Sequence, residues 1–290
     1  MRRLVALLFC LSLSAAASAE PRRPLVVVLD AGHGGVYPYD GAHGPRGLVE
    51  KDVALVVTLR LKELLEQAGT TVVLTRESDA NLPLWRRVLI ANDSGADLFL
   101  SIHCNSMPKL KDRLITRGAE TYFLSPDPTD REAKALADVE NEGAAPESRP
   151  SDAVSGILAD LALGQARNDS AHLAEIVQHR LVRDARVTNR GVRQAPFVVL
   201  AGTRMPSALV EIGFISHPLE GRMLGKDRHQ RVIARALAAA VQEYADDVLA
   251  RRLVASQAHV VLPEIVLVAH RPHRGDGKAA APVAAAAAPR

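Results

Sequence analysis

Short apolar runs alternate with amphipathic stretches from residue 25 to about residue 244. The runs are rich in aliphatic and β-branched residues and are bounded by turn formers, so they predict buried strands. These runs occupy residues 25–30, 71–75, 97–103, 119–124, 196–202 and 207–212. Apolar positions recur at helical spacing over residues 50–68, 82–92, 170–181 and 220–244. This order predicts an α/β fold: a mainly parallel, twisted sheet flanked by helices on both faces, in a single domain.

Residues 126–170 interrupt the alternation. They begin with a charged helical stretch, PDPTDREAKALADVENEG, pass through a proline-rich break, AAPESRPSD, and end in a second helical stretch, SGILADLALG. We therefore expect a helical segment inserted after the strand at 119–124. Farther along, the polar stretch RGVRQ at residues 190–194 predicts a loop before the strand at 196–202.

The first residues, MRRLVALLFCLSLSAAASAE, have the form of a secretory signal peptide. Two arginines precede a short apolar core, and an Ala-Ser-Ala triplet fits a cleavage site, so we expect residues 1–19 to be removed. The apolar core is too short for a membrane span, which predicts a secreted chain without a transmembrane segment. After cleavage Cys104 is the one cysteine left, and it cannot form an internal disulfide.

Basic residues are concentrated at the two ends of the chain. The whole chain has a net charge of +3, and loss of two arginines with the signal peptide leaves 34 basic against 33 acidic residues, or +1. Residues 248–290 carry six basic and two acidic residues, or +4, which leaves −3 for residues 20–247. An acidic core, in a chain with 3% aromatic residues overall, disfavours nucleic-acid binding. The Ala/Pro-rich tail, residues 247–290, is expected to be disordered and to contact an anionic surface.

Two histidines and two glutamates fall at the ends of predicted elements. His33 follows the strand in LVVVLDAGHGG, His103 ends the strand in DLFLSIHCN, and Glu211 lies near the end of MPSALVEIGF. Glu50 opens the first helix after a Gly/Pro-rich loop. Because sites in open α/β sheets form beyond the carboxyl ends of strands, we expect these side chains to meet there. Catalytic zinc takes three protein ligands of this kind plus water, and the fourth group would act as the base.

Each of these residues also has a simpler explanation. His33 could be a loop residue without a role, and Glu50 could be a first-turn carboxylate that interacts with the helix dipole. Glu211 could be a structural carboxylate, but VEIGF would bury its charge without an evident partner. A thiol nucleophile at Cys104 is disfavoured, because adjacent strand residues point to opposite faces and His103 is expected to face the site.

Five motifs, taken together and in order, resemble one enzyme family. LDAGHGG, Glu50 after its glycine-rich loop, SIHCNS, RGVRQA and MPSALVEIGFIS are similar to the zinc-dependent N-acetylmuramoyl-L-alanine amidases of the type 3 class. The resemblance covers the chain from about residue 24 to about residue 245. It implies that residues 24–246 form a catalytic domain.

The resemblance also implies a role for each of the four residues. His33, Glu50 and His103 would hold Zn²⁺, and Glu211 would be the catalytic carboxylate. The implied substrate is peptidoglycan, cut at the amide that joins N-acetylmuramic acid to the L-alanine of the stem peptide. The residue types agree, since zinc can activate water and polarise an amide carbonyl, and a glutamate can carry the proton to the leaving amine.

The inserted segment, residues 126–170, resembles the regulatory segment of the cell-division members of this family. In those members a helix covers the zinc and contributes a glutamate to it until a partner protein displaces the helix. Glu140 or Glu142, in ADVENEG, is the candidate autoinhibitory ligand here, and a LytM-type activator is the implied partner. Those members often carry an N-terminal targeting domain, which we do not expect in this chain, and the basic tail is a candidate substitute.

Three further polar residues are candidates for substrate binding. Asn105 would line the cleft, and Arg190 and Arg193 would either bind stem-peptide carboxylates or remain solvated. We therefore predict a secreted, periplasmic zinc amidase that acts on peptidoglycan in cell-wall remodelling or daughter-cell separation. Two alternatives stay open: a zinc carboxypeptidase that acts on the stem peptide, and a non-catalytic wall-binding module that keeps the fold.

Overall fold

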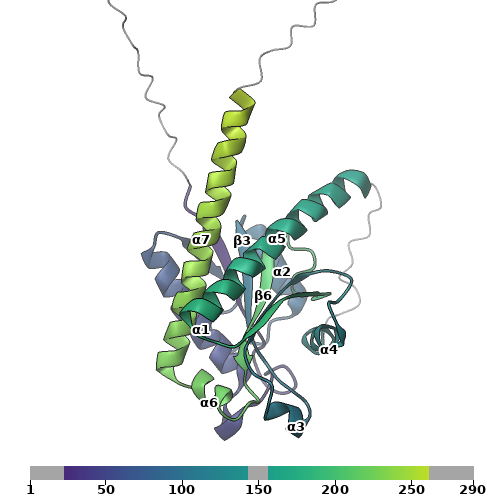
Figure 1. The fold of residues 1–290 in the computed structure, drawn as a ribbon, viewed down its shortest axis with the longest axis vertical. Coiled ribbons are helices and arrows are strands. Elements are labelled where there is room, and N and C mark those ends of the chain that lie inside the picture. Colours follow the sequence, from purple (N-terminus) through teal and green to yellow (C-terminus); the bar gives the residue numbers. More distant parts are fainter. Residues whose placement is uncertain (1–22, 143–155, 261–290) are drawn as a thin grey trace, which may run out of the picture. The chain divides into compact units, whose positions relative to one another are not determined.

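The computed structural model describes residues 23–142 and 156–260 (Figure 1). The predicted signal peptide therefore lies outside the described residues, and so does the predicted tail beyond residue 260. The chain divides into two compact units after Val248. The first residues of the predicted tail, up to Val260, are helical, because good helix formers such as Ala, Leu and Arg continue past the boundary that we predicted.

Six strands form one mixed sheet in the order β2-β1-β3-β6-β4-β5. The strands are β1 (Val26–Ala31), β2 (Thr71–Leu74), β3 (Leu98–Asn105), β4 (Ala119–Leu124), β5 (Asn189–Ala195) and β6 (Ser207–Phe214). Neighbouring strands are parallel, except that β4 runs antiparallel to β6. The carboxyl ends of β1, β3 and β6 therefore meet at one edge of the sheet, which confirms the prediction of a mainly parallel α/β fold.

Helices connect the strands and flank the sheet (Figure 1). They are α1 (Glu50–Gln67), α2 (Leu84–Asp93), α3 (Leu110–Arg113), α4 (Arg131–Glu140), α5 (Gly156–Asp184), α6 (Glu220–Leu224) and α7 (Asp227–Val260), with a 3₁₀ turn, η1, at Pro45–Gly47. Within the described residues, none of these helices combines the length and the apolar character that a membrane crossing requires.

The sheet has a buried core on each face, and alternate strand residues enter different cores. Cys104 lies in the core that α1, α5 and α7 cover, whereas Phe99 lies in the core that α2 and α4 cover. His103 alternates with Cys104 and projects from the same face as Phe99. Its partner in register, Glu211 of β6, does so too. We call this the site face; the prediction that Cys104 points away from it is confirmed.

Two segments near one edge of the sheet differ from the sequence prediction. Residues 190–194, predicted as a loop, belong to β5, and residues 196–202, predicted as a strand, form a turn. Because β5 is an edge strand that pairs with β4 alone, its polar side chains stay partly exposed and the apolar pattern of a strand is missing. The turn is apolar because Phe197 and Leu200 are buried in the core of the site face.

Two helix boundaries also differ from the prediction. Residues 156–164, GILADLALG, and residues 170–181 belong to one continuous helix, α5. The junction contains no proline, and a single glycine, Gly164, costs a helix only about 1 kcal/mol. The predicted closing helix, residues 220–244, is divided into α6 and α7. The division falls at Gly225, the C-cap of α6, since glycine commonly ends helices.

Candidate metal centre

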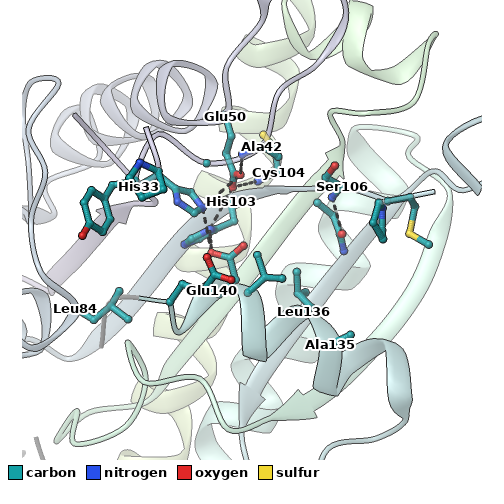
Figure 2. Close-up of a pocket in the computed structure, with 18 of the residues that line it drawn as sticks. His33, Ala42, Glu50, Leu84, His103, Cys104, Ser106, Ala135, Leu136 and Glu140 are labelled. Carbon is teal, nitrogen blue, oxygen red and sulfur yellow. Dashed lines mark hydrogen bonds and ion pairs between the residues drawn. The ribbon is translucent and has the colours of Figure 1, made fainter. Parts of the chain in front are cut away.

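His33 and His103 point toward each other from neighbouring strands (Figure 2). His103 lies in β3, and His33 follows β1 in a left-handed conformation, with φ of 58°. The two rings meet edge to face, with centroids 4.9 Å apart. A Cβ atom at Gly32 would lie 2.5 Å from the His103 ring, and one at Gly41 would lie 2.8 Å from the His33 ring. These two glycines are therefore needed for the rings to approach each other.

Glu50, the first residue of α1, directs its carboxylate toward the two histidines. The backbone N–H groups of Ala42 and Cys104 each donate to it at 2.8 Å, one to each oxygen. The same oxygens lie 3.3 Å from Nε2 of His33 and 3.2 Å from Nδ1 of His103. Glu50 is thus buried against the histidines, whereas a residue that only interacts with the helix dipole would face solvent.

Glu140, the last residue of α4, completes the cluster (Figure 2). Its Oε2 atom lies 3.1 Å from Nε2 of His33 and 3.0 Å from Nδ1 of His103. One ligand atom from each of the four residues His33, Glu50, His103 and Glu140 lies within 4.8 Å of the other three. Glu142, the second candidate in the inserted segment, is exposed and stays outside the cluster.

The ligand atoms fit a metal ion better than they fit hydrogen bonds. Nε2 of His33, Nδ1 of His103 and Oε2 of Glu140 are buried, and none has a partner with hydrogen-bond geometry in the described part of the chain. Buried polar atoms without partners are costly, so such convergence calls for a ligand. Imidazole nitrogens and carboxylate oxygens are common metal donors. The cluster is therefore able to bind a metal ion.

Burial and mutual attraction shift the pKa values of the four groups. Burial lowers the pKa of His103, but the carboxylates of Glu140 and Glu50 outweigh it and raise the pKa to about 10. Burial raises the pKa of Glu50, but His33 and His103 outweigh it and lower the pKa to about 2. Burial also lowers the pKa of His33, but the carboxylates of Glu50 and Glu140 outweigh it and raise the pKa well above its ordinary value. Burial raises the pKa of Glu140, but His33 and His103 outweigh it and lower the pKa. Without a metal, protonated histidines therefore lie between two carboxylates.

Glu211 lies beside His103 on β6 and projects from the same face of the sheet. Its carboxylate is completely buried, and neither oxygen has a hydrogen-bond partner among the described residues. Burial raises the pKa of Glu211 well above its ordinary value; His103 opposes this rise, and Glu140 and Glu50 add to it. A buried carboxyl group without a partner, next to a metal cluster, is suited to accept and donate a proton.

The three residues predicted to bind substrate surround another buried carboxylate, Glu120 of β4. Nδ2 of Asn105 donates to Glu120 Oε2 at 3.2 Å, and the guanidinium of Arg190 donates to Oε1. The guanidinium of Arg193 lies 3.9 Å from Oε1. Glu120 is the partner in register of Glu211 in the antiparallel pair β4–β6, so it extends the line of site side chains toward β5.

A cavity of about 870 Å³ adjoins the cluster. The loop before α1, the start of α2, the segment after β3 and helix α4 surround it. Tyr39, Leu84, Met107 and Leu136 give it apolar walls, whereas Asn105 and the cluster residues give it a polar end. Since α4 forms one wall and also carries Glu140, the position of α4 determines how much of the cluster a substrate can reach (Figure 2).

Two buried arginines support the His33 loop, and the sequence reasoning did not identify them. Arg87 of α2 donates to Asp30 Oδ1 and to the carbonyl oxygen of Ala31, both at 2.7 Å, and to the carbonyl oxygen of His33 at 2.9 Å. Arg76 donates to the carbonyl oxygen of Ala31 at 2.8 Å. A usable signal was present in Asp30, because a charge at the end of an apolar strand requires a cationic partner.

A family model and the similar known proteins all indicate one family, the N-acetylmuramoyl-L-alanine amidases. The family model for N-acetylmuramoyl-L-alanine amidase matches residues 27–243, a range that includes the cluster and Glu211. N-acetylmuramoyl-L-alanine amidase AmiC of Neisseria meningitidis is 35% identical over 235 residues, which cover 80% of this chain and 55% of that protein. AmiA of Escherichia coli is 36% identical over 224 residues, which cover 76% of this chain and 75% of that protein. The chain thus spans about half the length of the first relative.

Solved structures share the fold. N-acetylmuramoyl-L-alanine amidase AmiC2 of Nostoc punctiforme has a TM-score of 0.58 and 31% identity, with 77% of this chain and 97% of that chain covered. An N-acetylmuramoyl-L-alanine amidase from Clostridium difficile 630 has a TM-score of 0.59 and 26% identity, with 78% of this chain and 98% of that chain covered. The fold of this chain is therefore similar to that of these two amidases.

Proposed function

Because the chain belongs to the N-acetylmuramoyl-L-alanine amidase family, we propose that it is a zinc-dependent peptidoglycan hydrolase that α4 holds in a closed state. The bond cut is the amide between N-acetylmuramic acid and the L-alanine of the stem peptide. The observation that carries the proposal is the convergence of His33, Glu50, His103 and Glu140 on one point beside the buried Glu211.

In this proposal His33, Glu50 and His103 hold the zinc ion, a set of two nitrogens and one carboxylate that is typical of catalytic zinc. When bound, zinc supplies Lewis-acid chemistry: it polarises the amide carbonyl and acidifies water. The backbone donors on Glu50 and the contact from Arg87 to the His33 carbonyl orient the ligands before the metal binds.

Glu211 serves as the proton carrier. It takes a proton from the attacking water and passes it to the nitrogen of the leaving L-alanine. Two observations support this role: the carboxyl oxygens of Glu211 are buried without a partner among the described residues, and Glu211 lies beside the ligand His103. The raised pKa of Glu211 also favours the proton-bearing form that must exist midway through such a transfer.

Glu140 closes the site. Its carboxylate lies beside His33 and His103, where it would compete with water for a bound zinc ion. The basal activity of the full chain is therefore low, and a protein that removes α4 from the cavity activates the enzyme. A LytM-type activator is the partner that we propose for this step.

We also propose a place for the reaction. Residues 1–19 direct secretion, and the mature enzyme acts in the periplasm, where it remodels the wall or separates daughter cells. The sequence of the signal peptide and the similarity to the amidases AmiC and AmiA support this location.

Product analysis tests the activity. We would incubate purified peptidoglycan sacculi with the zinc-loaded full chain that carries Glu140→Ala, and with the matched double variant that also carries Glu211→Gln. An amidase releases intact stem peptides that begin with L-alanine, and the double variant releases none. Release of terminal amino acids alone would instead establish a carboxypeptidase. Binding without any product, in a zinc-loaded protein, would favour a wall-binding module.

A further inference from the structure

The amino-terminal end of α4 carries two carboxylates that contact the two arginines of β5. Asp130 caps α4 and lies 3.0 Å from Nη1 of Arg193. Glu132, in the first turn, lies 2.9 Å from Nη2 of Arg190 and 3.4 Å from Nη1 of Arg193. The helix that places Glu140 on the cluster is therefore also bound, at its other end, through ion pairs to the edge strand.

The length of α4 matches the distance between these two sites. From Glu132 to Glu140 the helix rises about 12 Å, at 1.5 Å per residue. From β3, which carries His103, to β5, which carries Arg193, there are three strand-to-strand steps across β6 and β4, or about 14 Å. One end of α4 thus lies over the metal cluster while the other end lies over the arginines.

The net charge around the arginines changes from −1 to +1 when α4 is removed. Arg190 and Arg193 bring two positive charges, and the buried Glu120 brings one negative charge. Asp130 and Glu132 add two more negative charges. Removal of α4 therefore exposes a site with a net charge of +1, in which two guanidinium groups lose their outer carboxylate partners. Guanidinium groups in this state bind carboxylates well, because their fork of donors matches the two oxygens.

From these contacts we infer that Arg190 and Arg193 form a carboxylate-binding subsite for the stem peptide, and that Asp130 and Glu132 occupy it as internal mimics of the substrate. The inference rests on the proposed function and deepens it. An extended peptide covers about 3.3 Å per residue, so the arginines are within reach of a carboxylate about four residues from the scissile amide. In the closed state α4 then blocks both ends of the substrate path, the metal with Glu140 and the subsite with its first turn.

The first arm of the test measures α4 directly and needs no activity. Hydrogen exchange of the α4 amides is compared in the zinc-loaded full chain, in Asp130→Asn/Glu132→Gln, and in the control Asp138→Asn. Asparagine still caps a helix, so the double variant removes charge and keeps the cap. Asp138 lies on the same helix and pairs with Lys134, not with the arginines. We expect exchange to rise on the order of tenfold in the double variant and less than about twofold in the control.

The second arm measures the subsite in an open full-length chain, Asp130→Asn/Glu132→Gln/Glu140→Ala. In this background Arg193→Gln should raise KM for a muramoyl peptide with free stem carboxylates on the order of tenfold, with kcat unchanged. Arg193→Lys keeps the positive charge and should raise KM for this peptide less than Arg193→Gln does. For the same peptide with amidated carboxylates, Arg193→Gln should have no effect. Arg183→Gln, on α5, is the matched control because its carboxylate partner is Asp184.

Either of two results would overturn the subsite. The first is an equal hydrogen-exchange rate of the α4 amides in the double variant and in the Asp138→Asn control. The second is that Arg193→Gln raises KM equally for the free-carboxylate and the amidated peptide. If the open chain binds zinc but cleaves neither peptide, the amidase proposal fails instead. The subsite is then still decided by calorimetry, in which the free-carboxylate peptide should bind the open chain on the order of tenfold more tightly than the amidated peptide.

Discussion

Arg87 fixes the backbone of the His33 loop through four hydrogen bonds, to Asp30, to the carbonyl oxygens of Ala31 and His33, and to that of Leu82. Because His33 adopts a left-handed backbone conformation, its loop needs such support to stay in place. The position of a metal ligand thus depends on an arginine that does not itself touch the metal.

Arg87→Lys keeps the charge and removes the planar fork of donors. We expect the free energy of unfolding to fall by about 2 kcal/mol, because carbonyl oxygens in a buried region lose their partners. Zinc affinity should fall as well, as measured by competition with a chelator. Arg86→Lys is the matched control, since Arg86 is exposed on the same helix and should change stability by less than about 0.5 kcal/mol. Equal effects of the two substitutions would exclude a special role for Arg87.

Protons compete with the metal for the histidines. The raised pKa values of His33 and His103 mean that their protonated forms stabilise the metal-free fold fully below the ordinary histidine value of 6.5, and that this contribution is lost as the pH rises through about 10 for His103. The lowered pKa of Glu50 means that its contribution is present above the ordinary value of 4.5 and is lost as the pH falls through about 2. The metal-free cluster is therefore most favourable between about pH 4.5 and 6.5.

Zinc binding at pH 7 should accordingly release about two protons, one from each histidine, because the metal takes neutral imidazole. Calorimetric titration of the metal-free chain with zinc, in buffers with different heats of ionisation, measures this number. In Glu140→Ala the number should be smaller, since loss of that carboxylate lowers both histidine pKa values. A zinc titration without proton release would contradict the protonated, metal-free state described above.

The sequence identifies some site residues better than others. His33, His103 and Glu211 are recognisable because each follows or ends an apolar strand, and parallel strands bring such ends together. Glu140 and Glu142 are not distinguishable from the sequence. Helical positions two residues apart differ by about 200° in direction, and the rotation of α4 is set by its packing. That packing depends on contacts with β5, a strand that the sequence does not reveal.

Helix α4 has a much smaller buried apolar surface than the helices that hold the fold together. Its fully buried residues are Ala133 and Ala137, whose methyl groups contribute about 2 kcal/mol. By contrast α1 buries four large aliphatic side chains, worth about 6 to 12 kcal/mol. These are Val53, Val57, Leu61 and Leu65. Much of the contact of α4 is polar, which suits a helix that a partner can remove.

Deletion of residues 128–165 should therefore raise basal activity and leave the fold intact. The guanidinium of Arg167 lies 3.1 Å from Oγ of Ser125, so the two sides of the deletion are already close together. The measurements are release of stem peptides from sacculi, zinc content and the unfolding transition. Unchanged or lower activity in a folded, zinc-loaded deletion variant would contradict the regulatory role of the segment.

The errors in the strand prediction over residues 190–202 have one physical cause. β5 has polar residues where a strand usually shows apolar ones, because its arginines interact with Glu120 and the carboxylates of α4. The turn at residues 196–202 is apolar because it fills the core of the site face next to α4. The apolar pattern of a sequence indicates which residues are buried, not which form strands. Here the strand is β5, which is polar, and the buried apolar segment is the turn at residues 196–202. The other strands are central or, in the edge strand β2, largely apolar, and the sequence predicts their positions to within a few residues.

At the scale of the whole chain, the basic charge and the site residues are separated along the sequence. Residues 20–247 carry a net charge of −3, and the metal cluster, Glu211 and Glu120 contribute four buried carboxylates to them. The basic residues 248–290 carry +4. This distribution follows from the sequence alone. The closed state of the site does not, since it depends on the contacts of α4 with the metal cluster and with the arginines of β5.

The most direct measurement is the rate at which zinc-loaded full-length chains release free stem peptides from sacculi. The wild-type chain is compared with Glu140→Ala and with Glu142→Ala, the exposed glutamate two residues away. The account predicts a low rate for the wild type, a rate at least about tenfold higher for Glu140→Ala, and a wild-type rate for Glu142→Ala. Equal rates for all three chains would contradict closure by Glu140, and no stem peptide from Glu140→Ala would contradict the amidase itself.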